Sequence, residues 1–162
     1  MSGGGEPAAR RALRFESLGA MLADARACVE AQTRGRLRRL GNWSLGTALA
    51  HIAEWADYPY VGYPAGLDFP EEVKARARAS IERILHETMA PGERLPGAEA
   101  GTYGVRDVSA TEGLAMLAAS AARLACEEPT VPDPVFGLVT REQWGLMTLR
   151  HAELHLSFYV EA

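Results

Sequence analysis

The amino-acid sequence predicts an all-α fold, a four-helix bundle with one additional accessory helix. Apolar residues recur at three- and four-residue steps in five segments, which is the period of a helix that buries one face. No segment shows the sustained two-residue alternation that is typical of a strand. The chain has 162 residues, of which 48% are hydrophobic, and it is therefore long enough for one domain whose core needs no disulfide or metal to fold.

The boundaries of the predicted helices rest on capping residues and prolines. Ser44 is a favourable N-cap, and Pro59 is expected to stop the helix that begins there. Ser109 and Thr140 each begin a capping box, in which two side chains satisfy free backbone N–H groups. The highly charged helix over residues 71–88 is expected to lie outside the core. The five predicted helices cover residues 17–33, 44–57, 71–88, 109–128 and 141–159.

The start of the domain and the class of the protein follow from composition. Residues 1–11 are rich in glycine and then in arginine, and they are expected to form a disordered tail before a domain over residues 12–162. The net charge of -4 argues against binding to nucleic acid, which needs a concentrated basic surface. No apolar run reaches the length of a membrane span, and no signal core is present, so a cytoplasmic protein is expected. Cys28 and Cys126 are expected to be buried, inert thiols.

His151 and His155 both lie on the apolar stripe of the last predicted helix. They are four residues apart, which is one helical turn, so their imidazoles can converge on one point, as a metal ion requires. The same spacing is found in core histidines that bind nothing, and for one pair alone that interpretation is the more common. The stripe comprises Trp144, Met147, His151, Leu154, His155 and Phe158.

A third histidine favours a metal site over core histidines that bind nothing. His51 lies in the middle of the second predicted helix, beside the stripe that faces the core. Three inward-facing histidines on two helices are explained most simply by one shared ion. Neutral imidazoles suit zinc, nickel, iron(II) or copper, and three protein ligands leave positions for water or substrate, which is typical of a catalytic site. His86, on the charged accessory helix, is expected to be solvated.

Other polar and aromatic residues near these histidines have alternative interpretations. Glu54 is a fourth ligand, a general base, a partner that orients an imidazole or, more commonly, a solvated carboxylate. Glu153 should point away from a metal held by its neighbours. Arg150 binds an anion or forms a surface ion pair, which is the more common fate. Four aromatic residues line a pocket or, more commonly, belong to the core: Trp43, Trp55, Tyr58 and Trp144.

Four stretches of the sequence carry a family resemblance. They are Asn42-Trp43-Ser44-Leu45-Gly46 through His51, Pro134-Val135-Phe136-Gly137, Thr140-Arg141-Glu142-Gln143-Trp144 and Arg150-His151-Ala152-Glu153-Leu154-His155-Leu156-Ser157-Phe158. Together they resemble the DinB-like superfamily, and more narrowly a bacterial branch known as a domain of unknown function. The resemblance covers about residues 13–161. It implies a bundle, often dimeric, in which a divalent metal is held at the positions of His51, His151 and His155.

The resemblance also implies a chemistry. Better-characterised members of the superfamily include mycothiol-dependent maleylpyruvate isomerase and S-transferases that join bacillithiol or mycothiol to electrophiles. Their metal is thought to bind and activate the thiol of a low-molecular-weight cofactor. No thiol-cofactor motif is recognisable in this sequence, so the substrate stays open.

Two hypotheses of different classes follow. The first is a metal-dependent enzyme, a thiol S-transferase or a hydrolase, that acts on a small molecule and is a homodimer. The second is a noncatalytic helical module for dimerisation or partner binding, with a structural or empty histidine site. Neither hypothesis includes a nucleic acid or a membrane as partner.

Overall fold

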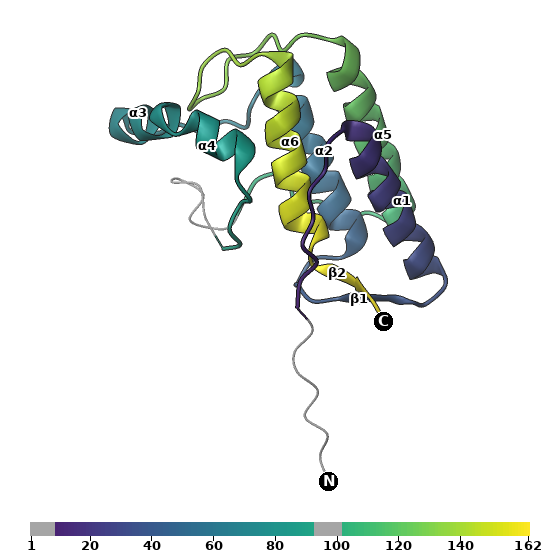
Figure 1. The fold of residues 1–162 in the computed structure, drawn as a ribbon. Coiled ribbons are helices and arrows are strands. Elements are labelled where there is room, and N and C mark those ends of the chain that lie inside the picture. The colour runs from purple at the N-terminus through teal and green to yellow at the C-terminus, as the bar shows by residue number, and fades with distance from the viewer. Residues whose placement is uncertain (1–8, 93–101) are drawn as a thin grey trace.

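The computed structural model describes residues 9–92 and 102–162. The fold of these residues is largely α-helical, as predicted, with six helices and one small two-stranded sheet (Figure 1). None of the described helices is long and apolar enough to cross a membrane. The elements are α1 Leu18–Thr33, β1 Leu37–Arg39, α2 Leu45–Val61, α3 Glu71–Ala79, α4 Ile81–His86, α5 Ala110–Cys126, α6 Arg141–Leu156 and β2 Tyr159–Glu161.

Three of the four long helices begin at the predicted N-caps Ser44, Ser109 and Thr140, and α1 begins after Ser17, the first residue of its predicted segment. The hydroxyls of Ser17, Ser44 and Ser109 each accept a hydrogen bond from the backbone N–H three residues further on. The predicted capping box is complete at Thr140, whose N–H donates to the side chain of Gln143. At Ser109 only one of the two predicted bonds is present, from the N–H of Glu112 to the Ser109 hydroxyl. These bonds satisfy backbone donors that have no partner within the helix.

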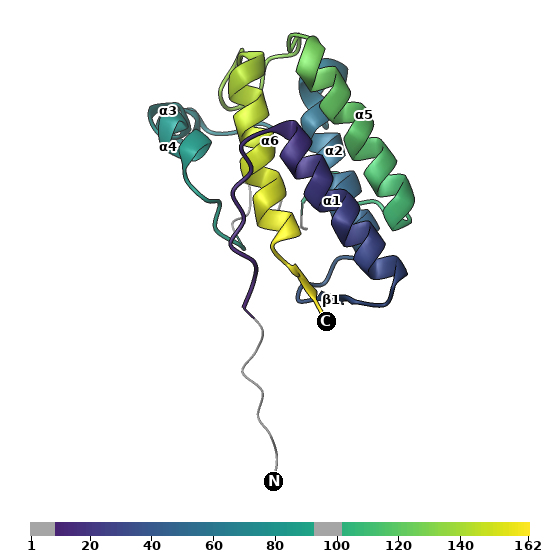
Figure 2. The same ribbon diagram turned by 45° about the vertical axis from the view of Figure 1, so that its right-hand side comes forward.

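Helix α2 lies at the centre of the long helices and is the most deeply buried of them (Figures 1 and 2). Its largest contact is with α5, and its other long neighbours are α6 and α1. Where α2 meets the start of α5, glycine allows the backbones to approach closely: a Cβ on Gly46 would overlap the carbonyl oxygen of Val108, two residues before α5. The main core cluster is built from Phe15, Met21, Ala25, Cys28, Leu45, Ala48, Leu49, Ile52, Ala53, Leu117, Ala121, Leu149, Ala152, Leu156 and Tyr159.

Helix α2 continues four residues beyond its predicted end, through Pro59. Proline lacks an N–H and normally interrupts a helix. Here the ring is fully buried, and the Pro59 carbonyl accepts hydrogen bonds from the N–H groups of Thr130 and Val131. Contacts with a segment far along the chain therefore hold the last turn in place. The helix ends at Gly62, whose φ of 101° lies in the left-handed region.

Three further predictions were wrong. The accessory helix is two helices, α3 and α4, separated at Ser80, and only Leu85 within them is buried. The last helix ends at Leu156 rather than near Tyr159, because the residues that follow form β2. This strand pairs antiparallel with β1, so strands are present where none was predicted. Each strand has three residues, too few to show an alternating pattern.

Residues that precede the predicted start of the domain already contact the helices. Residues 1–8 of the expected tail lie outside the described residues, whereas Arg10 and Arg11 lie against the folded part. The Arg11 guanidinium donates to both carboxylate oxygens of Asp24, at 2.7 and 2.8 Å, and to the carbonyl of Leu156. The Arg10 guanidinium lies 4.8 Å from the centre of the Phe158 ring.

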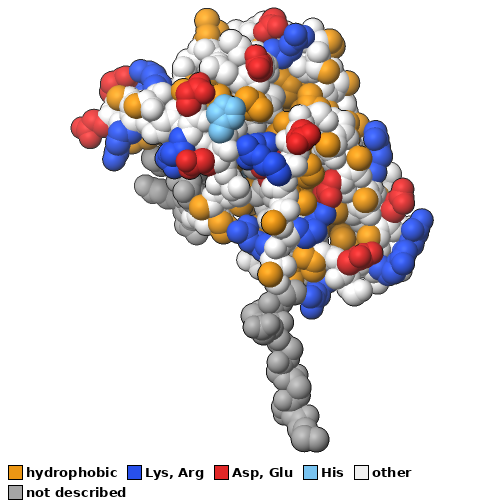
Figure 3. All heavy atoms as spheres, in the orientation of Figure 1, with side chains coloured by type: hydrophobic (Ala, Val, Ile, Leu, Met, Phe, Trp, Pro, Cys, Tyr) orange, Lys and Arg blue, Asp and Glu red, His pale blue; other side chains and the backbone are white. Residues whose placement is uncertain are grey.

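Acidic and basic side chains are interspersed over the face of the molecule shown in Figure 3, without a large area of one sign. This agrees with the small net charge of -4. His86 is exposed, as predicted, and its imidazole lies 3.7 Å from the carboxylate of Glu82.

Candidate metal centre

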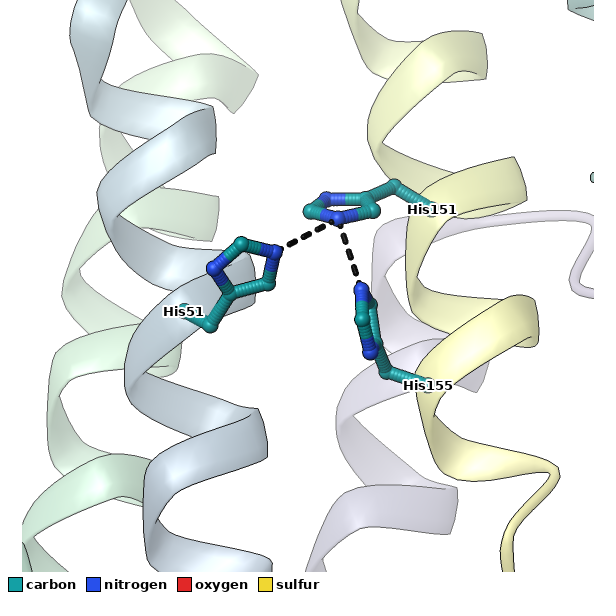
Figure 4. Close-up of side chains that lie close together, drawn as sticks. All are labelled: His51, His151 and His155. Carbon is teal, nitrogen blue, oxygen red and sulfur yellow. Dashed lines mark hydrogen bonds between the residues drawn. The ribbon is translucent and has the colours of Figure 1, made fainter. Parts of the chain in front are cut away.

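The three histidines singled out from the sequence lie together. His51 of α2 faces His151 and His155 of α6, and the three rings point their Nε2 atoms toward one another (Figure 4). The Nε2 atom of His151 lies 3.1 Å from that of His51 and 2.9 Å from that of His155. The helical spacing on α6 and the contact of α6 with α2 together produce this convergence.

Burial keeps these imidazoles neutral. His51 is 2% exposed, and its removal from water lowers its pKa to about 4. Burial lowers the pKa of His155 to about 3, and it lowers that of His151 well below the usual value, helped by the proximity of the other two rings. At pH 7 each ring therefore carries one proton, and the second nitrogen of each ring is a free donor to a metal.

Two tryptophans enclose the histidine cluster. Trp43 stacks on His155, with ring centres 5.1 Å apart and planes inclined by 10°, and its ring centre lies 4.8 Å from that of His51. The ring of Trp55 lies edge-on, 6.1 Å from His51 and 6.0 Å from His151. Both residues thus border the site.

The other two aromatic candidates lie further out. Tyr58 packs against Trp55, with ring centres 5.2 Å apart. Trp144 belongs to a second apolar cluster with Leu85 and Leu124, and its indole N–H donates to the carbonyl of Ala56. Trp144 is therefore a core residue, the more common alternative.

Glu54 is not one of the clustered ligands. Its carboxylate forms an ion pair with Arg106, at 3.3 Å, and only a fifth of its side chain is exposed. Glu54 lies one turn beyond His51 on α2, and its carboxylate lies beside Gly104 rather than in the cluster, since a Cβ on Gly104 would be 2.9 Å from one of its oxygens.

Arg150 and Glu153 are buried rather than exposed. Glu153 points away from the histidines, as predicted, but both residues are 2% exposed, and their ion pair has an N···O distance of 2.8 Å. The Glu153 carboxylate also accepts from the N–H of Phe15, whose carbonyl accepts from Arg150. The expectation of a surface ion pair was wrong because the N-terminal segment covers this face of α6.

Neither cysteine belongs to the histidine cluster. Cys28 is buried, as predicted, and burial raises the pKa of its thiol to about 11. Cys126 is exposed near the end of α5, so its predicted burial was wrong.

The histidine cluster fits a divalent transition metal. Two nitrogens that each lie about 2.1 Å from one ion, at angles of roughly 90–109°, are about 3.0–3.4 Å apart. The two Nε2 separations from His151, 3.1 and 2.9 Å, are close to this range, and the ligand atoms of all three histidines lie within 4.8 Å of one another. The donors are all imidazole nitrogens, which suit zinc, nickel, iron and copper rather than calcium or magnesium.

The structure adds backbone groups that the sequence does not mark. His51 Nδ1 lies 3.3 Å from the carbonyl oxygen of Gly104, and the indole N–H of Trp55 donates to the carbonyl of Tyr103 at 3.2 Å. Carbonyl groups carry no side-chain signature.

A comparison with protein families gives a match over residues 8–162, to the family described as "Protein of unknown function (DUF1569)". The chain belongs to this family. No curated protein and no solved structure gives a significant match. The family description agrees with the expected domain of unknown function, and it attaches no activity to the histidine cluster.

Proposed function

We propose that this protein is a DinB-like four-helix bundle that binds one divalent transition metal through His51, His151 and His155. The observation that carries the proposal is that Nε2 of His151 lies 3.1 Å from Nε2 of His51 and 2.9 Å from Nε2 of His155, while the ligand atoms of all three rings lie within 4.8 Å of one another. Nε2 of a neutral His151 has either one proton or one lone pair, so a single N–H···N hydrogen bond accounts for one of its two short contacts and leaves the other unexplained. One bound cation explains both contacts at once, and it therefore explains the arrangement better than three core histidines.

We propose further that the metal serves catalysis, in a thiol S-transfer or hydrolytic reaction on a small molecule. A divalent metal supplies Lewis acidity, which lowers the pKa of a thiol or of water. Three protein ligands leave room for such a group. Since Cys28 is buried and Cys126 lies on α5, the nucleophile comes from outside the chain, as a low-molecular-weight thiol or as water.

The metal is tested by elemental analysis of protein purified without a metal-binding tag and without added metal. We expect about one equivalent of a divalent transition metal in the wild type, and a loss of most of it in His151→Ala. The matched control is His86→Ala, which removes an exposed histidine and should leave the content unchanged. A normal metal content in His151→Ala would refute the ligand assignment.

Removal of the metal distinguishes a catalytic from a structural ion. The large apolar core predicts that the chelated protein keeps its helical circular dichroism and a cooperative unfolding transition. Loss of folding on chelation would favour the noncatalytic module with a structural site. Turnover of thiol, ester or amide substrates is then compared between metal-loaded and chelated protein.

A further inference from the structure

We infer that residues 102–106 form a positioning segment for the metal centre, and that the carbonyl oxygen of Gly104 selects the nitrogen with which His51 binds the metal. The inference rests on the proposed metal site and adds a main-chain group to it. Neither a side-chain motif nor the family description points to this role.

The carbonyl of Gly104 determines which nitrogen of His51 carries the proton. A carbonyl oxygen can only accept a hydrogen bond, so at 3.3 Å from Gly104 it is Nδ1 of His51 that carries the proton. A neutral imidazole has one proton, and Nε2 is therefore left with a lone pair. Nε2 of His51 points to Nε2 of His151, at 3.1 Å (Figure 4). A metal-binding histidine commonly donates its other ring N–H to a carbonyl oxygen in this way, and the hydrogen bond fixes the orientation and the tautomer of the ring.

Helix α2 itself holds residues 102–106 in place. Trp55, one turn beyond His51, donates its indole N–H to the carbonyl of Tyr103. Glu54 forms its ion pair with Arg106 at the other end of the segment. The ligand and the two side chains that secure its partner thus lie on one face of one helix, so a movement of α2 carries all three together.

The side chains of Glu54 and Tyr58 pack closely against Gly104. Its φ of 71° lies in the left-handed region, which a residue with a Cβ rarely adopts. A Cβ there would lie 2.9 Å from a carboxylate oxygen of Glu54 and 3.1 Å from the hydroxyl of Tyr58. Alanine would displace these groups or shift the backbone, and the carbonyl would leave Nδ1. Glycine is therefore required for the contact with His51.

The test uses Zn²⁺ as the probe and two pairs of matched variants. Trp55→Phe removes an indole N–H that donates to the segment, whereas Trp144→Phe removes one that donates to Ala56, away from it. Gly104→Ala adds a crowded Cβ, whereas Gly66→Ala adds a Cβ in open space at a similar φ of 88°. The second variant of each pair shows how far the same type of substitution changes Zn²⁺ affinity at a position away from the segment.

Zn²⁺ affinity is measured by competition with a chromophoric chelator. Loss of a group that orients a ligand weakens metal binding by about 10–100-fold, and we expect this for Trp55→Phe and Gly104→Ala. Trp144→Phe and Gly66→Ala should stay close to the wild type. Equal affinities within each pair, with all variants folded by circular dichroism, would overturn the inference.

A second readout needs no metal. In ¹⁵N-labelled metal-free protein, the imidazole resonances of His51 should show the Nδ1–H tautomer in the wild type and a mixture of tautomers in Gly104→Ala. An Nε2–H tautomer in the wild type would refute the role of Gly104. If the wild type binds no Zn²⁺ at all, the proposed function fails, while the tautomer still decides whether Gly104 sets the ring.

Discussion

The three clustered imidazoles differ from an exposed histidine in the pH range over which they stay neutral. A proton competes with a metal for a nitrogen only below the pKa that this nitrogen has in the metal-free protein. Because burial lowers the pKa of His51 to about 4 and that of His155 to about 3, we expect Zn²⁺ affinity to change little between about pH 7.5 and about pH 5.5. Competition titrations over this range check it. A steep loss that begins near the ordinary pKa of about 6.5 would contradict it.

The two thiols should differ strongly in reactivity. The thiolate is the reactive form, and burial raises the pKa of Cys28 to about 11, so at about pH 8 its thiol is neutral as well as inaccessible. We expect an alkylating reagent to modify Cys126 quickly and Cys28 only in denaturant, as followed by mass spectrometry. The Cys126→Ser variant is the control, since it should leave a single slow thiol. Similar rates for both cysteines in the folded wild type would contradict the assignment.

Single residues were predictable from the sequence where the helical period alone decides their surroundings. His51, His151 and His155 face inward because of that period, and the structure brings them together. Arg150 and Glu153 could not be placed, because their burial depends on Phe15, which lies 135 residues before Arg150 in the chain. Most ion pairs lie on the surface, so only the tertiary contacts show that this pair is buried.

At the level of elements, α2 and α5 depend on glycine for their close approach. A Cβ on Gly113 would lie 2.6 Å from the carbonyl oxygen of Gly46 and 3.0 Å from Cβ of Leu49, and neither atom can rotate away. We expect Gly113→Ala to lower the free energy of unfolding by about 1–3 kcal/mol, the usual cost of overpacking. Urea denaturation followed by circular dichroism measures it.

Gly145 provides the control for that prediction. It also lies inside a long helix, α6, but a Cβ there would meet no atom within 4 Å. Alanine has the higher helix propensity, so Gly145→Ala should raise the free energy of unfolding by about 0.5–1 kcal/mol. If both substitutions change stability by the same amount, the helices do not meet as closely as described.

The starts of the helices were more predictable than their ends. An N-cap such as Ser44 or Thr140 acts within one turn, so its effect is visible in local sequence. The end of α2 depends instead on the bonds that the Pro59 carbonyl forms with a distant loop. The pairing of β1 with β2 joins residues 37 and 161, and no local pattern in either segment marks it.

Across the whole molecule, the buried pair Arg150–Glu153 joins the N-terminal segment to α6. The carboxylate of Glu153 holds both Arg150 and the N–H of Phe15. Glu153→Gln keeps the shape but leaves the buried guanidinium without a negative partner, and we expect the free energy of unfolding to fall by about 3–5 kcal/mol. The exposed pair Arg78–Glu71 is the control, because Glu71→Gln should cost less than about 1 kcal/mol. Equal effects of the two substitutions in urea denaturation would show that the Glu153 pair is not buried.

The proposed function depends on one metal ion held jointly by α2 and α6. A crystal structure of protein purified without added metal, with data collected on both sides of a metal absorption edge, locates such an ion. We expect a single anomalous peak, about 2.0–2.2 Å from the Nε2 atoms of His51, His151 and His155. A cluster without such a peak, in crystals whose protein contains a full equivalent of metal, would refute the metal site.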